Sequence, residues 1–279
     1  MSQFKLCAFA DEAGADIQDQ IQALNDNNIP FLEVRGVADR NFTKLSIQEA
    51  KELKTRLASH DIRIWSIGSP LGKIGITDDF GPHMELFLHT LELARAVEAQ
   101  CIRLFSFFIP SDKDAAIYRN EVMERLSRFS EAAKGSGVTL CHENEKGIYG
   151  DNADRCFDIH RQLPALAAIF DPANFVQCNQ DTIKAWELLS PYVKYMHIKD
   201  AIQGGAVVPA GKGNGNLPYL LEKYKLQGGT VLTLEPHLKV FSGFEALENG
   251  EKISISDEYS YPSQRAAFDA AVSALRVLI

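Results

Sequence analysis

Four side chains of metal-binding type stand at or near the ends of apolar stretches in the second half of this sequence. Three are carboxylates and one is an imidazole: Glu143, Asp171, His197 and Glu235. The stretches that carry them are rich in Val, Ile, Leu, Phe and Tyr, which favour buried β-strands. Oxygen donors with one imidazole suit Mn²⁺, Mg²⁺ or Co²⁺, and Zn²⁺ also accepts such a set. The pattern predicts a site for one divalent cation, provided that the four strand ends meet.

Eight apolar runs alternate with helical patterns along the whole chain. The predicted strands cover residues 4–10, 29–36, 62–69, 101–108, 138–145, 167–170, 193–198 and 230–235. The predicted helices cover residues 16–27, 46–60, 82–98, 112–134, 152–163, 180–189, 217–224 and 262–277. Eight β/α units in 279 residues, with no linker between them, favour an α/β fold: a single (β/α)₈ TIM barrel domain over residues 1–279.

Side chains alternate across a strand, so residues two apart share a face. Glu143 then shares its face with Cys141, and His197 shares its face with Tyr195 and Lys199. If these faces point inward, the four candidate ligands converge at the C-terminal mouth of the barrel, where TIM barrels hold their active sites. Taken alone, each of the four has an ordinary alternative, such as a salt bridge, a turn or a hydrogen-bonded core histidine.

The composition argues against several classes of partner. The formal charge is −8 and the isoelectric point about 5.4, whereas duplex nucleic acid and anionic membranes bind basic surfaces. The five cysteines form no CxxC pair and several lie in apolar runs, which indicates reduced thiols. No apolar signal core follows the first residues, and no run is long enough to cross a bilayer. We therefore expect a cytoplasmic protein that binds a small molecule, and neither nucleic acid nor a membrane.

Four motifs carry a resemblance to a known family. They are His-Glu143-Asn, Phe-Asp171-Pro-Ala-Asn, His197-Ile-Lys-Asp and Leu-Glu235-Pro-His. With them the whole chain resembles the xylose isomerase-like TIM barrel superfamily, in particular its sugar phosphate isomerase/epimerase group, which includes ketose 3-epimerases and inosose dehydratases. The resemblance implies that the matching Glu, Asp, His and Glu bind one divalent cation. It also implies that Glu143 and Glu235 are catalytic and transfer protons.

The sequence departs from the ketohexose epimerases at two positions. Where they have a histidine three residues after the Asp, this chain has Asn174; where they have an arginine six residues after the metal-binding His, it has Gln203. Both family residues contact sugar hydroxyls, so the metal chemistry is expected to carry over while the sugar can differ. The superfamily's DNA repair endonucleases use extra histidines near the second and third strands, which this chain lacks. With the acidic charge, this disfavours DNA cleavage.

The sequence also offers candidates for contacts with the substrate. Lys199 shares the ligand face of its strand and suits an oxyanion or a phosphate, with a rim salt bridge as the alternative. The other candidates lie on strands or in the loops after them: Glu33, Arg35, Asn174, His237, Trp65 and Lys73. The turn Val208-Pro-Ala-Gly-Lys-Gly213 resembles the family's Pro-x-Gly-x-Gly loop. A loop over residues 241–261 is expected to cap the pocket or to contact a neighbouring subunit of a homo-oligomer.

Together these observations predict a metal-dependent isomerase or epimerase of a keto sugar or sugar phosphate. One glutamate takes the proton next to the carbonyl to form an enediolate, and the other delivers a proton at the product position. An inosose dehydratase-like lyase would use the same base and cation to expel a β-hydroxyl. A non-catalytic barrel would bind sugar and metal without proton exchange. A metal-independent enzyme that resembles hydroxypyruvate isomerase would not need all four ligands.

Overall fold

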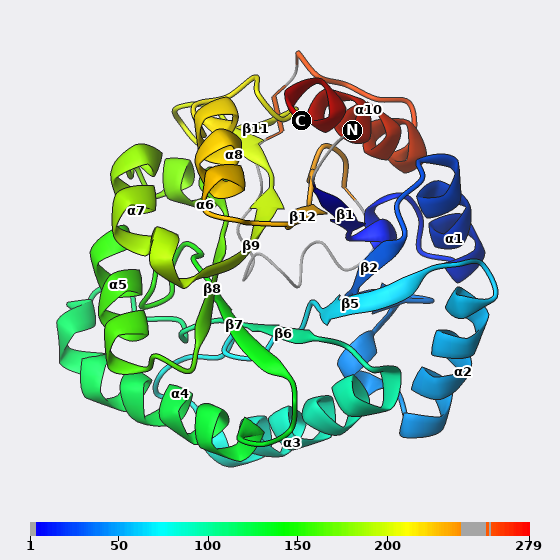
Figure 1. The fold of residues 1–279 in the computed structure, drawn as a ribbon. Coiled ribbons are helices and arrows are strands. Elements are labelled where there is room, and N and C mark those ends of the chain that lie inside the picture. Colours follow the sequence, from blue (N-terminus) through cyan, green and yellow to red (C-terminus); the bar gives the residue numbers. More distant parts are fainter. Residues whose placement is uncertain (1–3, 241–254, 257) are drawn as a thin grey trace.

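The computed structural model describes residues 4–240, 255–256 and 258–279. In this part of the chain, eight parallel strands close into a barrel in the order β1-β12-β9-β8-β7-β6-β5-β2 (Figure 1). They are β1 (Lys5–Ala8), β2 (Phe31–Val34), β5 (Arg63–Ile67), β6 (Cys101–Leu104), β7 (Thr139–Glu143), β8 (Ala167–Phe170), β9 (Val193–Ile198) and β12 (Val231–Leu234). The predicted TIM barrel is confirmed. Most of the loop expected over residues 241–261 lies outside the described residues, so its role as a cap or contact stays a prediction.

Helices surround the barrel on its outer side (Figure 1). The long ones are α1 (Ile17–Asp26), α2 (Ile47–Ala58), α3 (Phe80–Val97), α4 (Arg119–Ala133), α5 (Ala153–Gln162), α7 (Thr182–Leu189), α8 (Leu217–Leu226) and α10 (Gln264–Leu278). Polar side chains cap two of their starts: Asp16 accepts a hydrogen bond from Gln18 N–H, and Ser46 forms a capping box with Glu49. Within the described residues, no helix combines the length and apolar character needed to span a membrane.

Several short elements lie between the barrel strands and the long helices, and periodicity does not predict them because they are too short. They are α6 (Pro172–Gln177), the hairpins β3 (Gly36–Val37) with β4 (Arg40–Asn41) and β10 (Asp200–Ala201) with β11 (Val207–Val208), and the 3-10 turns η1 (Ala10–Glu12), η2 (Phe42–Lys44), η3 (Ala115–Tyr118) and η4 (Ser190–Tyr192). Helix α4 begins at Arg119 and not at 112, since Asp114 caps η3 ahead of it.

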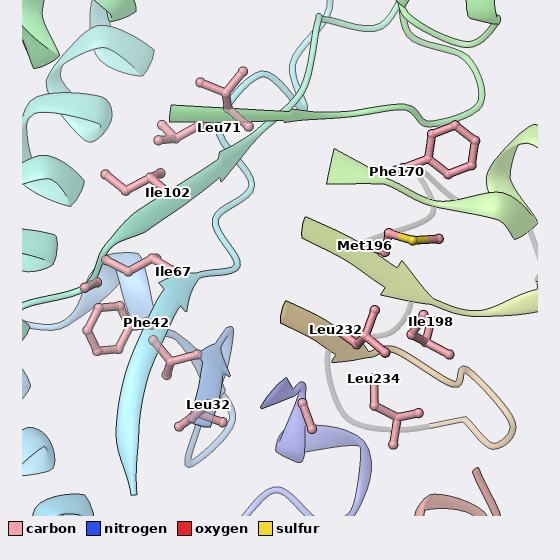
Figure 2. Packing of buried hydrophobic residues seen from close by; sticks show 14 of the residues in the cluster. Leu32, Phe42, Ile67, Leu71, Ile102, Phe170, Met196, Ile198, Leu232 and Leu234 are labelled. Carbon is pink, nitrogen blue, oxygen red and sulfur yellow. The ribbon is translucent and has the colours of Figure 1, made fainter. Parts of the chain in front are cut away.

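The outer faces of the strands carry the main hydrophobic core. Figure 2 shows Leu32, Ile67, Ile102, Met196 and Leu232 on these strands, and each is at most 1% exposed. Burying such a side chain contributes roughly 1.5–3 kcal/mol. A shift of one residue along a strand would turn these side chains inward and set charged side chains against the helices. The apolar outer face therefore fixes which residues face the barrel axis.

The interior of the barrel is apolar toward the N-terminal ends of the strands and charged toward the mouth. The apolar layer consists of Cys7, Trp65, Cys101, Cys141, Ile169, Tyr195 and Val231. Two residues after four members of this layer come Arg103, Glu143, Asp171 and His197, all of them buried. The apolar layer is therefore a floor that closes the charged half of the interior from below.

A register shift changes which residues of β5 face inward. Glu33 of β2 pairs with Ser66, which leaves Trp65 as the extra residue of a β-bulge. Trp65 belongs to the apolar floor, edge-on to Tyr195 at 6.3 Å between ring centroids. Ser66 also faces inward, because its hydroxyl lies 3.3 Å from Glu33 Oε1. The sequence suggests Trp65 as a contact for the substrate. The structure places it in the apolar floor, below the mouth.

A buried histidine in α3 holds the turn after β5. His83 Nε2 accepts a hydrogen bond from the backbone N–H of Gly72 at 2.7 Å. Gly72 has a φ of +86°, and a Cβ there would lie 2.0 Å from the carbonyl oxygen of Phe105, so the turn requires glycine. Burial, with a smaller effect of Arg125, lowers the pKa of His83 to about 4. Only a neutral imidazole can accept this bond.

We predict that the free energy of unfolding falls as the pH drops from about 6.5 toward 4, because the unfolded chain then binds a proton that the folded His83 excludes. Urea unfolding at several pH values measures this. The variant His83→Gln keeps an acceptor for Gly72 but does not titrate, so its loss of stability over this range should be smaller. A constant difference between the two proteins from pH 7.5 to 5 would contradict the prediction.

Candidate metal centre and active site

The structure brings the four predicted metal ligands together at the mouth of the barrel. Glu143 ends β7, Asp171 follows β8, His197 lies in β9 and Glu235 follows β12. Each is at most 2% exposed, and one ligand atom from each lies within 4.8 Å of those of the other three. The alternation of side chains along the strands thus led to the correct faces. We call these four residues the ligand group.

His197 presents one ring nitrogen to the ligand group and the other to the floor. Its Nδ1 lies 2.8 Å from Glu143 Oε1 and 3.2 Å from Glu235 Oε2, while Nε2 lies 3.3 Å from Glu33 Oε2. Burial lowers the pKa of His197, but these carboxylates outweigh burial and raise it well above its usual range. Glu33 therefore contacts the ring nitrogen of His197 that points away from Glu143 and Glu235.

Arg103 is a site residue to which no sequence motif points. Its Nη1 lies 3.1 Å from Glu143 Oε2 and 3.2 Å from Glu235 Oε1, so one guanidinium nitrogen bridges the two glutamates. A signal was present, because Arg103 is a lone charge in the apolar run Cys101–Leu104 and alternates with Cys101 on the inner face. Lys199 also contacts the ligand group, with Nζ 2.9 Å from Asp171 Oδ2 and 3.5 Å from Glu235 Oε2.

Arg35 joins three carboxylates from two separate segments, the turn η1 and the residues after β12. Its Nε and Nη2 bind both oxygens of Asp11 at 2.9 and 3.0 Å, and Nη2 lies 3.2 Å from Glu12 Oε1. Its Nη1 lies 3.0 Å from Glu235 Oε1. Glu12, Glu235 and His237 also offer ligand atoms within 4.8 Å of one another. Since Glu235 already belongs to the ligand group, we assign no second cation to these three residues.

Among the described residues, the buried carboxylates of this network outnumber the cations that they contact. Asp11, Glu12, Glu33, Glu143, Asp171 and Glu235 face Arg35, Arg103 and Lys199. If all six carboxylates are ionised and His197 and His237 are neutral, as cation binding at His197 Nδ1 requires, three negative charges remain, and a divalent cation would offset two of them. Burial raises the pKa of Asp171 to about 7 and that of Glu12 to about 8, as expected for carboxylates that lack sufficient positive charge.

The ligand group fits a divalent cation. Asp171 Oδ2 and Glu235 Oε2 are buried and accept no hydrogen bond, although Lys199 Nζ lies close to both as an ion-pair partner. Buried oxygens without hydrogen bonds are costly unless a cation binds them. Three carboxylates and an imidazole form a donor set that Mn²⁺, Mg²⁺, Co²⁺ and Zn²⁺ accept.

Hydrogen bonds to the backbone fix the position of Asp171. The side chain of Asn144 accepts from Asp171 N–H at 3.0 Å and donates to Asp171 O at 2.9 Å. Asp171 Oδ1 caps α6 by accepting from Asn174 N–H at 2.9 Å, which leaves Oδ2 for the ligand group. The side-chain nitrogen of Asn174 donates to Asn144 O at 2.8 Å. Asn174, predicted to contact the substrate, thus holds the two ligand-bearing loops together.

Lys73 and His237 lie at the rim of the same network. Lys73 Nζ is 3.2 Å from Glu145 Oε2 and 4.5 Å from the ring centroid of Phe105. The backbone N–H of His237 donates to Glu12 Oε2 at 2.7 Å, and its Nε2 lies 3.6 Å from Glu235 Oε1. Burial, together with Lys199, lowers the pKa of His237 to about 3, so its ring is neutral.

Asp200 is a second residue whose role the sequence did not reveal. Its carboxylate accepts four backbone N–H groups at 2.9–3.0 Å: those of Ala201, Gly211, Gly213 and Gly215. A Cβ at Gly213 would lie 2.3 Å from Asp200 Oδ1, so this approach requires glycine. The acid that ends the His197-Ile-Lys-Asp motif therefore shapes the glycine-rich loop next to the mouth.

Comparisons with known proteins give a consistent result. The sequence profile of the family described as "Xylose isomerase-like TIM barrel" matches residues 21–251. Similar solved structures include the IOLI protein with a binding zinc atom, at 13% identity and a TM-score of 0.75, covering 99% of this chain and 98% of that chain. D-psicose 3-epimerase with D-tagatose from Clostridium cellulolyticum H10 is 16% identical with a TM-score of 0.72, covering 98% of each chain.

A third similar structure is the probable 3-DHS dehydratase AsbF from Bacillus anthracis, at 15% identity and a TM-score of 0.72, covering 98% of each chain. At such identities the likeness concerns the fold alone. No curated protein sequence matches the chain closely enough to count as a relative.

We predict that the metal-free protein binds one divalent cation per chain, because the ligand group has an excess of buried negative charge. Titration calorimetry with Mn²⁺ and Zn²⁺ measures this, and a cation at 100 times its Kd should stabilise the fold by about 2.7 kcal/mol. Asp171→Asn should weaken binding by at least about 10-fold, since it removes a charged ligand. The exposed control Glu131→Gln should bind as the wild type does. Equal affinity for Asp171→Asn would refute this assignment.

Proposed function

Because the chain belongs to the xylose isomerase-like TIM barrel family, we propose that it is a metal-dependent isomerase or epimerase of a keto sugar or sugar phosphate. The observation that carries the proposal is the position of two glutamates. Glu143 and Glu235 belong to the ligand group, and both contact His197 Nδ1. We propose Mn²⁺, Mg²⁺ or Co²⁺ as the cation, with Zn²⁺ as the alternative that the zinc-containing IOLI structure supports.

The two glutamates are the proposed proton-transfer groups. A bound divalent cation would supply Lewis-acid polarisation of the carbonyl and the neighbouring hydroxyl of the sugar. One glutamate takes the proton from the carbon next to the carbonyl, and the other returns a proton at the product position. Strands β7 and β12, which carry Glu143 and Glu235, are separated by β8 and β9 around the barrel. This spacing brings the two carboxylates to one substrate from different directions.

Two cationic side chains are placed to stabilise the negative charge that develops on an enediolate. Arg103 Nη1 lies between Glu143 and Glu235, and Lys199 Nζ lies between Asp171 and Glu235. Both are buried, and a fixed charge in a dry site stabilises a transition state more strongly than it would in water. These two groups are therefore proposed to contact substrate oxygens during proton transfer.

Two residues beside the ligand group are proposed to bind the part of the substrate that does not react. Lys73 and His237 are the proposed contacts for distant hydroxyls or a phosphate: Lys73 Nζ pairs with Glu145, and His237 Nε2 lies 3.6 Å from Glu235 Oε1. Arg35 is saturated by carboxylates, so its part in substrate binding would be to orient Glu235. All five cysteines of the sequence are free, which supports the proposed location in the reducing cytoplasm.

We predict that the metal-loaded protein exchanges a carbon-bound proton of a keto sugar, such as D-tagatose, or of a keto sugar phosphate with solvent deuterium. Proton NMR in D₂O over a panel of such sugars measures this exchange. Glu143→Gln and Glu235→Gln should each lower the rate by about 10²- to 10⁴-fold, because an amide cannot take up the proton. The exposed control Glu222→Gln should retain the wild-type rate.

The products of the same experiment separate the competing functions. Deuterium at an inverted carbon identifies an epimerase, and a shifted carbonyl identifies an isomerase. Loss of water identifies a dehydratase-type lyase. Sugar binding without any exchange identifies a non-catalytic barrel. Full exchange in both glutamate variants, or in the chelated protein, would rule out the proposed mechanism.

A further inference from the structure

Glu33 lies where it can control the chemistry of His197 without contacting the substrate. It is 0% exposed and points inward from β2, below the ligand group. Its Oε2 lies 3.3 Å from His197 Nε2, on the opposite side of the imidazole from Nδ1. Its Oε1 accepts from the hydroxyl of Tyr195 at 2.8 Å and from that of Ser66 at 3.3 Å. Both carboxylate oxygens are therefore engaged inside the barrel.

A neutral imidazole carries its single N–H on one of two nitrogens. Only Nδ1 faces the other members of the ligand group, so Nδ1 must keep its lone pair for a cation. The hydrogen must then reside on Nε2, where Glu33 Oε2 is the acceptor. A carboxylate acceptor at this place fixes the tautomer and makes the ligating nitrogen more basic.

Neighbouring groups hold both partners of this pair in place. The β-bulge that leaves Trp65 unpaired turns the hydroxyl of Ser66 toward Glu33 and to 3.0 Å from that of Tyr195. The rings of Phe9 and Tyr195 flank His197 at centroid distances of 5.3 and 5.5 Å, both at steep angles. The imidazole plane is thus set by packing, and its hydrogen position is set by Glu33.

We propose that Glu33 is a positioning residue of the metal centre, which holds His197 in the Nε2–H tautomer so that Nδ1 binds the cation. This inference rests on the metal-binding part of the proposed function and is independent of the sugar and of the reaction. It assigns Ser66 and Tyr195 the role of orienting the Glu33 carboxylate. It also replaces the expectation from the sequence that Glu33 contacts the substrate.

The test compares zinc affinity and the histidine tautomer in the full-length protein. Long-range proton–nitrogen NMR of the Zn²⁺-loaded wild type should show His197 bound through Nδ1, with a strongly hydrogen-bonded Nε2–H. Glu33→Gln should weaken Zn²⁺ and Mn²⁺ binding by about 10- to 100-fold and shift the Nε2–H signal upfield. Circular dichroism of the metal-free variant verifies that it is folded.

Further variants separate positioning from a general loss of structure. Tyr195→Phe keeps the ring and the Glu33 carboxylate but removes one bond to it, so it should weaken metal binding less than Glu33→Gln does. Glu12→Gln changes another buried carboxylate of the network that is not bonded to His197, and it should leave the Nε2–H signal in place. If Glu33→Gln does not fold, the metal affinity of Tyr195→Phe and the spectrum of the wild type still test the proposal.

Two results would overturn the proposal. One is a metal affinity of folded Glu33→Gln within twofold of the wild type, and the other is a wild-type His197 that binds Zn²⁺ through Nε2. In either case the proposed sugar chemistry still stands if solvent exchange is observed. Conversely, the protein can bind metal with the expected tautomer and exchange no sugar proton. The role proposed for Glu33 then stands, and the proposed function is wrong.

Discussion

The mouth of this barrel is governed by one electrostatic constraint, which is that more carboxylates are buried there than cationic side chains can balance. Arg35, Arg103 and Lys199 each contact at least two of these carboxylates. A buried charge without a partner costs several kcal/mol, so the chain can keep this arrangement only by distributing each positive charge over several acids. The remaining negative charge is what makes the ligand group suited to a divalent cation.

Many hydrogen bonds around the site come from backbone N–H groups, which is consistent with the same constraint. Asp171 is held by the side chain of Asn144 and by the start of α6, and Asp200 collects four backbone N–H groups of the glycine-rich loop. Neutral N–H donors orient a carboxylate without adding a mobile side chain. The loops next to the ligand group thus acquire defined positions, although they lie outside the hydrogen bonding of the barrel strands.

The fold and the ligand group could be predicted because both follow from local periodicity. Alternation along each strand, combined with the rule that strand ends meet at the mouth, placed Glu143, Asp171, His197 and Glu235 together. Trp65 could not be placed, because a β-bulge shifts the alternation and no residue type marks the bulge. The partners of Arg35 and Arg103 also escaped prediction, since they lie up to 200 residues away along the chain and depend on distances in space.

The division of the interior into an apolar floor and a charged mouth links stability to chemistry. The floor excludes water from below, which lowers the local dielectric constant and strengthens every ion pair above it. Glu33 lies at this boundary, with its carboxylate bonded to Tyr195 of the floor and to His197 of the ligand group. In such a dry network, removing one member leaves the charge of its partner buried and uncompensated. The carboxylates, arginines and lysine at the mouth therefore form one electrostatic network around the ligand group.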